Sequence, residues 1–293
     1  GAVFTGSTEV AEIIHRTLAR RGNVPLVAET GGQNAMVVDS SALPEQVVAD
    51  AIASAFDSAG QRCSALRVLC LQEEIAGRVL PMLAGAMAEL AVGEPSRLAT
   101  DVGPIIDEAA RAGLEAHIAR LEGSAKLVAR APAPQAGHGH FIAPVAFEIG
   151  SLAELGREVF GPVLHVVRFR GGELARVVEE INATGYGLTF GIHSRLDSTI
   201  DFLSGRIRAG NVYVNRNVVG AVVGVQPFGG EGLSGTGPKA GGPRYLRALV
   251  RPAAPQPAGA QPPLPAADAA SSPDCAAAVA AVDSNSGGTS LWS

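Results

Sequence analysis

FDSAGQRCSALRVLCL, residues 56–71, joins two segments of different hydrophobic periodicity and carries one cysteine, Cys63, at their connection. Apolar residues in 43–56 recur at helical spacing, and Gly60 ends this pattern. Residues 68–71 form a short apolar run that is typical of a buried strand. The sequence therefore predicts a helix, a tight connection that bears Cys63, and a strand. In such an arrangement a rigid scaffold can hold a reactive side chain.

Cys63 has two interpretations. A cysteine acts as a nucleophile in its thiolate form, so it needs cationic or hydrogen-bond-donating surroundings, or a nearby base. Arg62 and the backbone N–H groups of the Gly-Gln-Arg turn could supply such donors. Alternatively, Cys63 is a small buried hydrophobe, as most intracellular cysteines are. The local sequence leaves both interpretations open.

Strand and helix patterns alternate along the rest of the chain. Strands are expected at residues 24–27, 35–38, 126–129, 141–147, 163–169, 188–193 and 211–214, with a last short one at 245–250. Helices are expected at 73–90, 107–121, 173–182 and 197–203, with one helical turn at 152–155. This alternation predicts an α/β domain with a mostly parallel sheet.

The chain opens on a strand that ends at Phe4 and turns through Gly6 and Ser7 into a helix. Unpaired N–H groups and the helix dipole make such a turn a possible anion site, although an ordinary helix N-cap is the alternative. A dinucleotide-binding fold needs several strand–helix units, and only the last of one set is visible here. We therefore expect the chain to be truncated at its N-terminus.

Two carboxylates and a glycine-rich segment are further candidates for a site. Glu29 lies between an apolar strand and a pair of glycines, where partial desolvation would raise its pKa and suit a general base. Glu158 and Phe160 precede a Gly-Pro turn, and such residues can bind a ribose. Taken alone, each motif is more typical of an ordinary turn. Residues 220–242 are so rich in glycine that their backbone is expected to approach a ligand.

Composition argues against several classes of protein. The net charge of −5 is dispersed, which predicts no binding of nucleic acid or of anionic membranes. No apolar stretch is long enough to span a membrane and no secretory signal is visible, so we expect a cytoplasmic protein. Three unpaired cysteines and dispersed histidines predict neither disulfides nor a metal site. Residues 253–293 are rich in Pro, Ala and Ser, which predicts a disordered tail.

Several motifs together resemble the aldehyde dehydrogenase superfamily. FTGSTEVA, AETGGQNAMVV, GQRCSALRV, EVFGPVL and QPFGGEGLSGTG occur in the order and spacing of that family over about residues 1–250, with a 34-residue step from Glu29 to Cys63. Within the superfamily, AETGGQN, GQRCSALRVL and VVGVQPFGGEGLSGTGPKAGGPRYL are most similar to one subfamily. This is the L-glutamate γ-semialdehyde (1-pyrroline-5-carboxylate) dehydrogenase domain of bifunctional proline utilisation A enzymes.

The resemblance implies an NAD-dependent oxidation of L-glutamate γ-semialdehyde to L-glutamate in proline catabolism. Cys63 would attack the aldehyde to form a thiohemiacetal and then a thioester, its N–H would help to hold the oxyanion, and Glu29 would activate water. The residues implied for the cofactor are Gly6 and Ser7 at the pyrophosphate and Glu158 and Phe160 at the ribose. Those implied for the substrate are Ser64, Gly220 and Ala221 at its carboxylate, with Arg62 assisting and Phe56 and Phe228 beside its aliphatic part.

The same resemblance divides the chain into four parts. Residues 1–28 would be the remnant of a Rossmann-like NAD domain, 29–242 the catalytic domain, 243–252 a possible oligomerisation strand of a homo-oligomer, and 253–293 the tail. The adenosine-binding half, an oxyanion asparagine and the proline dehydrogenase barrel with its FAD lie outside these motifs. We therefore expect weak NAD binding, an exposed apolar sheet edge, and an isolated chain that is inactive.

Three questions stay open at this point. Another semialdehyde dehydrogenase is the nearest alternative, and a non-catalytic module that serves only for assembly is an alternative of a different class. The residues that would decide between NAD and NADP lie in the part that the motifs do not cover.

Overall fold

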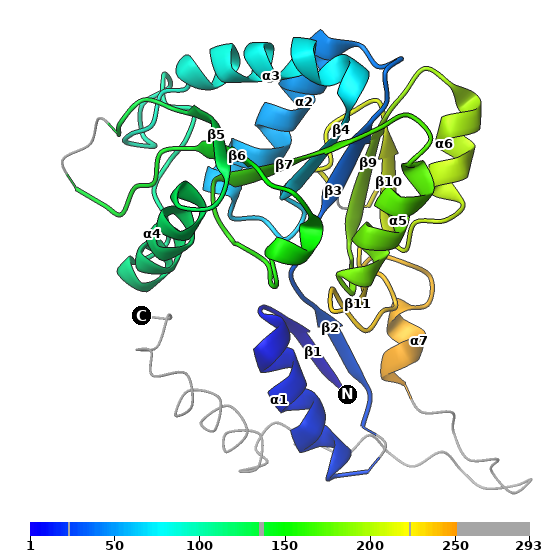
Figure 1. The fold of residues 1–293 in the computed structure, drawn as a ribbon. Coiled ribbons are helices and arrows are strands. Elements are labelled where there is room, and N and C mark those ends of the chain that lie inside the picture. Colours follow the sequence, from blue (N-terminus) through cyan, green and yellow to red (C-terminus); the bar gives the residue numbers. More distant parts are fainter. Residues whose placement is uncertain (23, 135–137, 223, 251–293) are drawn as a thin grey trace, which may run out of the picture.

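The computed structural model describes residues 1–22, 24–134, 138–222 and 224–250. Its centre is a seven-stranded sheet with the order β10-β9-β3-β4-β7-β6-β5 (Figure 1). The strands are β3 (Ala35–Val38), β4 (Val68–Gln72), β5 (Lys126–Arg130), β6 (Val145–Glu148), β7 (Val163–Phe169), β9 (Thr189–His193) and β10 (Asn211–Val214). Neighbouring strands are parallel except for β5, which runs antiparallel to β6. The predicted α/β fold with a parallel-rich sheet is confirmed.

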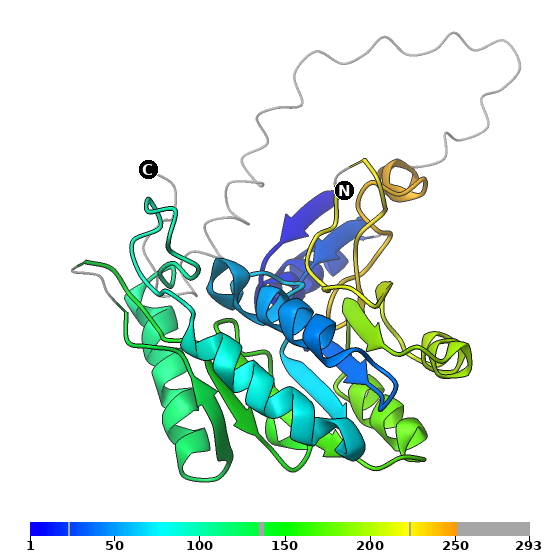
Figure 2. The ribbon, with the colours of Figure 1, turned by 90° about the horizontal axis from the view of Figure 1, so that it is seen from above.

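Helices cover both faces of this sheet. They are α2 (Pro44–Phe56), α3 (Glu73–Ala88), α4 (Glu108–Glu122), α5 (Leu174–Ala183) and α6 (Asp197–Ser204). From β3 and β4 the chain crosses to the edge strand β5, comes back through β6 and β7, and then continues to β9 and β10 on the other side of β3. Because crossovers between parallel strands are right-handed, this reversal places α2 and α3 on one face and α5 and α6 on the other. Figure 2 shows α2 and α3 side by side, in contact with each other.

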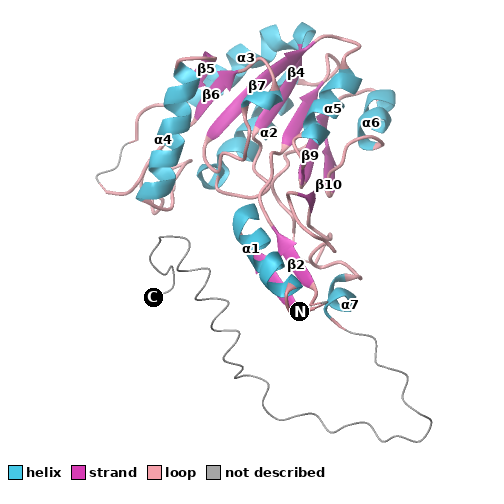
Figure 3. Ribbon diagram, turned by 60° about the horizontal axis from the view of Figure 1, so that its bottom comes forward, coloured by secondary structure: helices cyan, strands magenta, loops and turns pink. Residues whose placement is uncertain are grey.

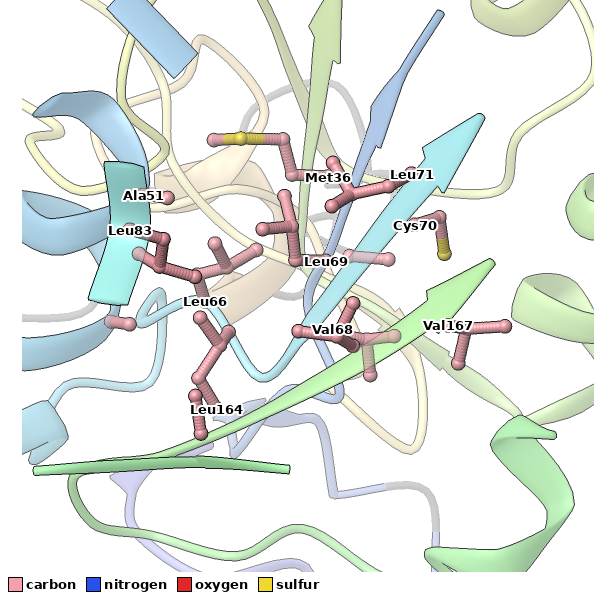
Figure 4. Close-up of a cluster of buried hydrophobic side chains, with 14 of the residues drawn as sticks. Met36, Ala51, Leu66, Val68, Leu69, Cys70, Leu71, Leu83, Leu164 and Val167 are labelled. Carbon is pink, nitrogen blue, oxygen red and sulfur yellow. The ribbon is translucent and has the colours of Figure 1, made fainter. Parts of the chain in front are cut away.

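The core lies between the central strands and α2 and α3. Every residue of β3 is buried, and in β4 only the last residue is partly exposed. Continuous apolar runs of this kind are expected where helices cover both faces of a parallel sheet. Figure 4 shows Met36 and Leu69 from the sheet close to Leu83 of α3, and all three side chains are fully buried. This core holds the amino ends of β3 and β4 in place.

A smaller unit precedes the large sheet. It consists of β1 (Ala2–Thr5), α1 (Thr8–Ala19) and β2 (Leu26–Glu29), and its two strands are parallel. Figure 3 shows it below the large sheet, next to α7 (Tyr245–Leu249). Val3 of β1 is 56% exposed, as expected for an uncovered apolar edge. Residues 30–34 connect this unit directly to β3.

One predicted element is wrong and two have shifted. The strand predicted at 245–250 is the helix α7, because its Leu, Arg and Ala residues favour a helix and it packs against β2. The strands predicted at 24–27 and 141–147 are β2 and β6, which begin later than predicted, directly after Pro25 and Pro144. Proline has no N–H to donate to a ladder, so the pairing starts after it. The predicted tail 253–293 lies outside the described residues, and oligomerisation stays a prediction.

Two short strands connect the glycine-rich segment to the large sheet. β8 (Tyr186–Gly187) and β11 (Glu231–Gly232) form an antiparallel pair immediately before β9. Two 3₁₀-helices complete the elements of the described residues, η1 (Asp57–Gly60) and η2 (Leu152–Glu154), and η2 is the helical turn predicted at 152–155. Among the described residues, no helix has the length and apolar character needed to cross a membrane.

The connection from α2 to Cys63 has an unusual backbone. Ser58, Ala59 and Gly60 have φ values of 56°, 53° and 65°, so three consecutive residues adopt the left-handed conformation. A left-handed backbone costs an ordinary L-residue about 1–2 kcal/mol. A Cβ on Gly60 would overlap the carbonyl oxygen of Gly161, so the turn requires glycine both for its φ and for this close approach.

Replacing Gly60 with alanine should therefore destabilise the fold by about 1–3 kcal/mol, because both the φ value and the neighbouring backbone would be strained. Gly77 is the matched control, since it lies exposed in α3 with open space around it. Gly77→Ala should stabilise the protein by about 0.5–1 kcal/mol. Urea unfolding followed by circular dichroism measures both, and equal effects would contradict the account of this turn.

Candidate active site

The candidate site lies at the amino edge of the sheet. Glu29, Cys63 and Glu158 each lie a few residues before a strand, β3, β4 and β7 respectively. These strands are parallel neighbours, so they begin at the same edge and bring the three preceding segments together. All three residues line one cavity of about 930 Å³. Its lining also includes Gly6, Ser7 and Phe160, so the cavity contains all six residues predicted for catalysis and for the cofactor.

The residues predicted for the substrate are not part of this lining. Phe56 is a fully buried core residue, and Ser64 is only 7% exposed. The exposed Arg62 is turned back along its own segment, where its Nε donates to Ser58 Oγ at 2.9 Å. The other three residues are in the late loop, where Phe228 pairs its backbone with Ala240, Gly220 is exposed and Ala221 is partly buried. Their roles stay predictions.

Cys63 is partly buried and faces opposing influences. Burial and the charges of Glu158 and Glu29 raise the pKa of its thiol, while the backbone N–H groups of Ser64 and of Cys63 itself lower it. The raising influences prevail, so the resting group is the neutral thiol. Attack by this sulfur therefore requires a base to remove its proton.

Asn34 and Thr189 hold the turn that carries Cys63. Nδ2 of Asn34 donates to the carbonyl oxygens of Cys63 at 2.7 Å and Ala65 at 2.8 Å. Thr189 donates its Oγ1 to the carbonyl of Ser64 at 3.3 Å and its N–H to Asn34 Oδ1 at 3.0 Å. Three successive carbonyls are thus bonded to Thr189 of β9 and to Asn34, which directly precedes β3. The N–H groups of Ser64 and Cys63 act on the sulfur and lower the pKa of its thiol, so they are candidate donors to an oxyanion formed beside it.

Glu29 is the candidate general base. Burial raises its pKa to about 7, although the N–H of Gly230 and the ammonium of Lys239 oppose the shift. Its Oε2 accepts from Gly230 N at 3.3 Å, and Oε1 is buried without a partner among the described residues. A Cβ on Gly229 would overlap Oε1. The glycine-rich segment therefore approaches Glu29 itself, and it leaves a carboxylate that can exchange a proton near neutral pH.

Glu158 lies beside the backbone of the Thr-Gly-Gly turn. A Cβ on Gly31 would overlap Oε2 of Glu158, and the N–H of Gly32 donates to this carboxylate. Burial raises the pKa of Glu158, while Arg67, whose Nη2 lies 3.2 Å from Oε1, opposes the shift. The adjacent Phe160 is 45% exposed and presents its ring to the cavity.

Gly6 and Ser7 lie at the start of α1, but their polar groups already have partners. Ser7 is the N-cap of α1, and its Oγ accepts from Val10 N at 3.3 Å. Gly6 donates its N–H to the carbonyl of Glu29 at 3.1 Å. The ordinary N-cap is thus present, and the anion-binding role of this turn stays a prediction.

Two buried residues of the site are absent from the predicted set. Asn34 and Arg67 are 2% and 0% exposed, although one lies two residues after a glycine pair and the other directly precedes an apolar strand. The only indication in the sequence is their polarity within otherwise apolar surroundings. The described part of the chain holds no group of three or more His, Cys, Asp or Glu residues that could hold a metal ion.

Glu29 should make stability depend on pH. An acid with a higher pKa in the folded than in the unfolded state favours folding at low pH, and this contribution is lost as the pH rises through about 7. Compared with Glu29→Gln, the wild-type protein should therefore lose free energy of unfolding between pH 5 and pH 8. Urea titrations at both pH values measure this difference. Glu89→Gln is the control, at an exposed position at the end of α3. The difference in free energy of unfolding between the wild-type protein and this variant should be the same at both pH values.

Comparisons with known proteins show the family to which the chain belongs. The profile of the aldehyde dehydrogenase family matches residues 1–253. The bifunctional protein PutA of Escherichia coli is 59% identical over 261 residues, which cover 85% of this chain and 20% of that protein. The 1-pyrroline-5-carboxylate dehydrogenase of Geobacillus kaustophilus is 36% identical over 250 residues, which cover 83% of this chain and 48% of that enzyme.

Solved structures give the same result. A crystal structure of bifunctional proline utilization A (PutA) superposes with a TM-score of 0.81 at 58% identity, over 84% of this chain and 25% of that one. The 1-pyrroline-5-carboxylate dehydrogenase from Thermus with bound NAD superposes with a TM-score of 0.78 at 35% identity, over 84% of this chain and 48% of that one. The chain spans a fifth to a half of the lengths of these relatives. It belongs to the aldehyde dehydrogenase family and has the aldehyde dehydrogenase fold.

Proposed function

We propose that this chain is the catalytic part of an NAD-dependent dehydrogenase that oxidises L-glutamate γ-semialdehyde to L-glutamate in proline catabolism. The observation that carries the proposal is that Cys63 and Glu29 line one cavity, where the charge of Glu29 acts on the thiol of Cys63. The substrate is suggested by the relatives, which are named as PutA and as 1-pyrroline-5-carboxylate dehydrogenases.

Cys63 is the nucleophile in this proposal. Ionised Glu29, with its pKa of about 7, takes the thiol proton directly or through a water molecule. The sulfur then forms a bond to the aldehyde carbon, and the carbonyl oxygen becomes an oxyanion beside the N–H groups of Cys63 and Ser64. The turn held by Asn34 orients these groups before the substrate binds.

Glu29 acts again after oxidation. Once the hydride has left, the acyl group is joined to Cys63 as a thioester. Glu29 releases the thiol proton to solvent and, ionised again, removes a proton from the attacking water. The carbon–sulfur bond then breaks, Glu29 returns this proton to the sulfur, and the carboxylic acid product loses its own proton to solvent. A carboxylate whose pKa lies near 7 can serve both as proton acceptor and as donor in this cycle.

The cavity fits the nicotinamide half of NAD, which when bound would accept the hydride. It extends from Gly6 and Ser7 to Cys63, and the carboxylate of Glu158 and the ring of Phe160 both line it. A carboxylate can accept two ribose hydroxyls, and an aromatic ring can pack against the sugar. A solved relative is described as binding NAD, which supports the same choice of cofactor.

Recognition of the substrate carboxylate is assigned to Ser64, Gly220 and Ala221. This assignment rests on the family resemblance, because the described structure does not place these residues in the cavity lining. Assembly as a homo-oligomer and a cytoplasmic location likewise belong to the proposal, and they rest on the sequence analysis alone.

The test is NADH production, followed by absorbance, in a chimera of the Escherichia coli PutA relative whose matching segment is replaced by this chain. The chimera should oxidise glutamate semialdehyde, and Cys63→Ala should lower its turnover by at least about a thousandfold. Cys70→Ala is the matched control, because that thiol is fully buried and burial raises its pKa to about 12. It should leave turnover nearly unchanged.

Two outcomes would reject the proposal. One is a folded chimera that is inactive with this and other aldehydes, which would favour a module used only for assembly. The other is a Cys63→Ala chimera as active as its parent. Faster oxidation of a different semialdehyde would support the proposed reaction and replace the proposed substrate with that semialdehyde.

A further inference from the structure

We propose that Arg67 is a positioning residue that holds the turn before Cys63 and the carboxylate of Glu158 in one fixed arrangement. The inference deepens the proposed function, and it rests on that function for the roles of Cys63 and Glu158. Its evidence is the set of bonds that this side chain makes between two segments far apart in sequence.

Arg67 lies just before β4, four residues after Cys63, and its side chain is fully buried. Nη1 donates to the carbonyl oxygens of Gly60 at 2.7 Å and Gly161 at 3.2 Å. Nη2 donates to the carbonyl of Arg62 at 3.1 Å and to Glu158 Oε1 at 3.2 Å. One guanidinium therefore joins the nucleophile turn to the segment that carries Glu158 and Gly161.

The turn that Arg67 holds is strained. Ser58 and Ala59 adopt left-handed conformations at φ values of 56° and 53°, directly before the bonded carbonyls of Gly60 and Arg62. Such conformations persist only where the surroundings impose them. Bonds to two carbonyls of the turn, together with the close approach of Gly60 to Gly161, supply this constraint.

Arg67 also provides the buried positive charge of the site. The guanidinium faces Glu158 on one side, and its Cζ lies 5.2 Å from the centre of the Phe160 ring. The charge of Cys63 in its thiolate form also acts on it. The sequence favoured Arg62 as the donor near Cys63, but that side chain turns back to Ser58. The fully buried cation beside Glu158 is Arg67.

The main chain of Arg67 is held as firmly as its side chain. Its carbonyl oxygen accepts from the backbone N–H of His165 at 2.9 Å, and His165 Nδ1 lies at the same distance. Burial lowers the pKa of His165 to about 3 and that of His117 to about 4, so both rings are neutral. Nδ1 of His165 therefore carries the proton that it donates to Arg67, and its Nε2 accepts from Nε2 of His117 at 2.9 Å.

Lysine cannot reproduce this arrangement. A guanidinium offers five donors in a rigid planar fork, whereas an ammonium is a compact point charge with three. Arg67→Lys should therefore keep the positive charge and lose several of the four bonds. Arg67→Met loses the positive charge as well as the hydrogen bonds. A comparison of the two variants therefore separates the effect of the bonds from the effect of the charge.

The first measurement is amide hydrogen exchange on this chain, read by mass spectrometry. Both Arg67→Lys and Arg67→Met should speed exchange at least tenfold in peptides covering 57–66 and 158–161. Peptides from β9 and β10 should be unchanged. Arg168→Met is the matched control, because Arg168 forms an exposed pair with Glu148 at 2.8 Å, away from the turn.

The second measurement is the pH dependence of alkylation of Cys63 by iodoacetamide, in a Cys275→Ser background. A nearby cation typically favours a thiolate by about one pKa unit or more, so Arg67→Met should slow alkylation about tenfold at pH 7. Arg67→Lys should leave the apparent pKa close to the wild-type value. Glu158→Gln should speed alkylation, because the charge of Glu158 disfavours the thiolate.

Hydrogen exchange and alkylation test the proposal without an assay of enzymatic activity. Unchanged local exchange in Arg67→Lys would overturn it, and so would exchange that rises equally throughout the protein, because the residue would then be merely structural. If Arg67→Met does not fold, Arg67→Lys still supplies both readouts. If Cys63→Ala leaves the chimera active, the proposed function fails while these measurements still report on Arg67.

Discussion

The constraint on which this structure depends is that three neighbouring parallel strands, β3, β4 and β7, begin at one edge of the sheet. In open α/β sheets, ligands usually bind beyond the carboxyl ends of the strands. Here the functional side chains lie at the amino edge instead, because Glu29, Cys63 and Glu158 each precede their strand. The buried core sets the positions of the strand ends, and the strand ends set the positions of these groups.

Glycines allow these segments to come as close as they do. Gly31 leaves room for Glu158, Gly229 leaves room for Glu29, and Gly60 allows two backbones to meet at Gly161. A glycine-rich loop in a binding protein usually suggests contact between its backbone and a ligand. In this chain the glycines first make room for the carboxylates of the protein itself, and so keep those carboxylates at the cavity.

Burial then sets the chemistry of the site. Burial and the charges of the two carboxylates raise the pKa of the Cys63 thiol. Burial also raises the pKa values of Glu29 and Glu158. The compensating positive charges come from Arg67, beside Glu158, and Lys239, near Glu29. The balance brings the pKa of Glu29 to about 7, where a carboxyl group can accept a proton from a thiol or from water.

The sequence by itself determined the α/β class, the connection that bears Cys63 and the candidates Glu29 and Glu158, because periodicity and glycine placement are local properties. Only the tertiary structure decided that these residues share a cavity and that Arg67, rather than Arg62, is the buried cation. It also made 245–250 helical, because this segment packs against β2. Burial, desolvation and pairing depend on segments far apart in the chain, so no local pattern contains them.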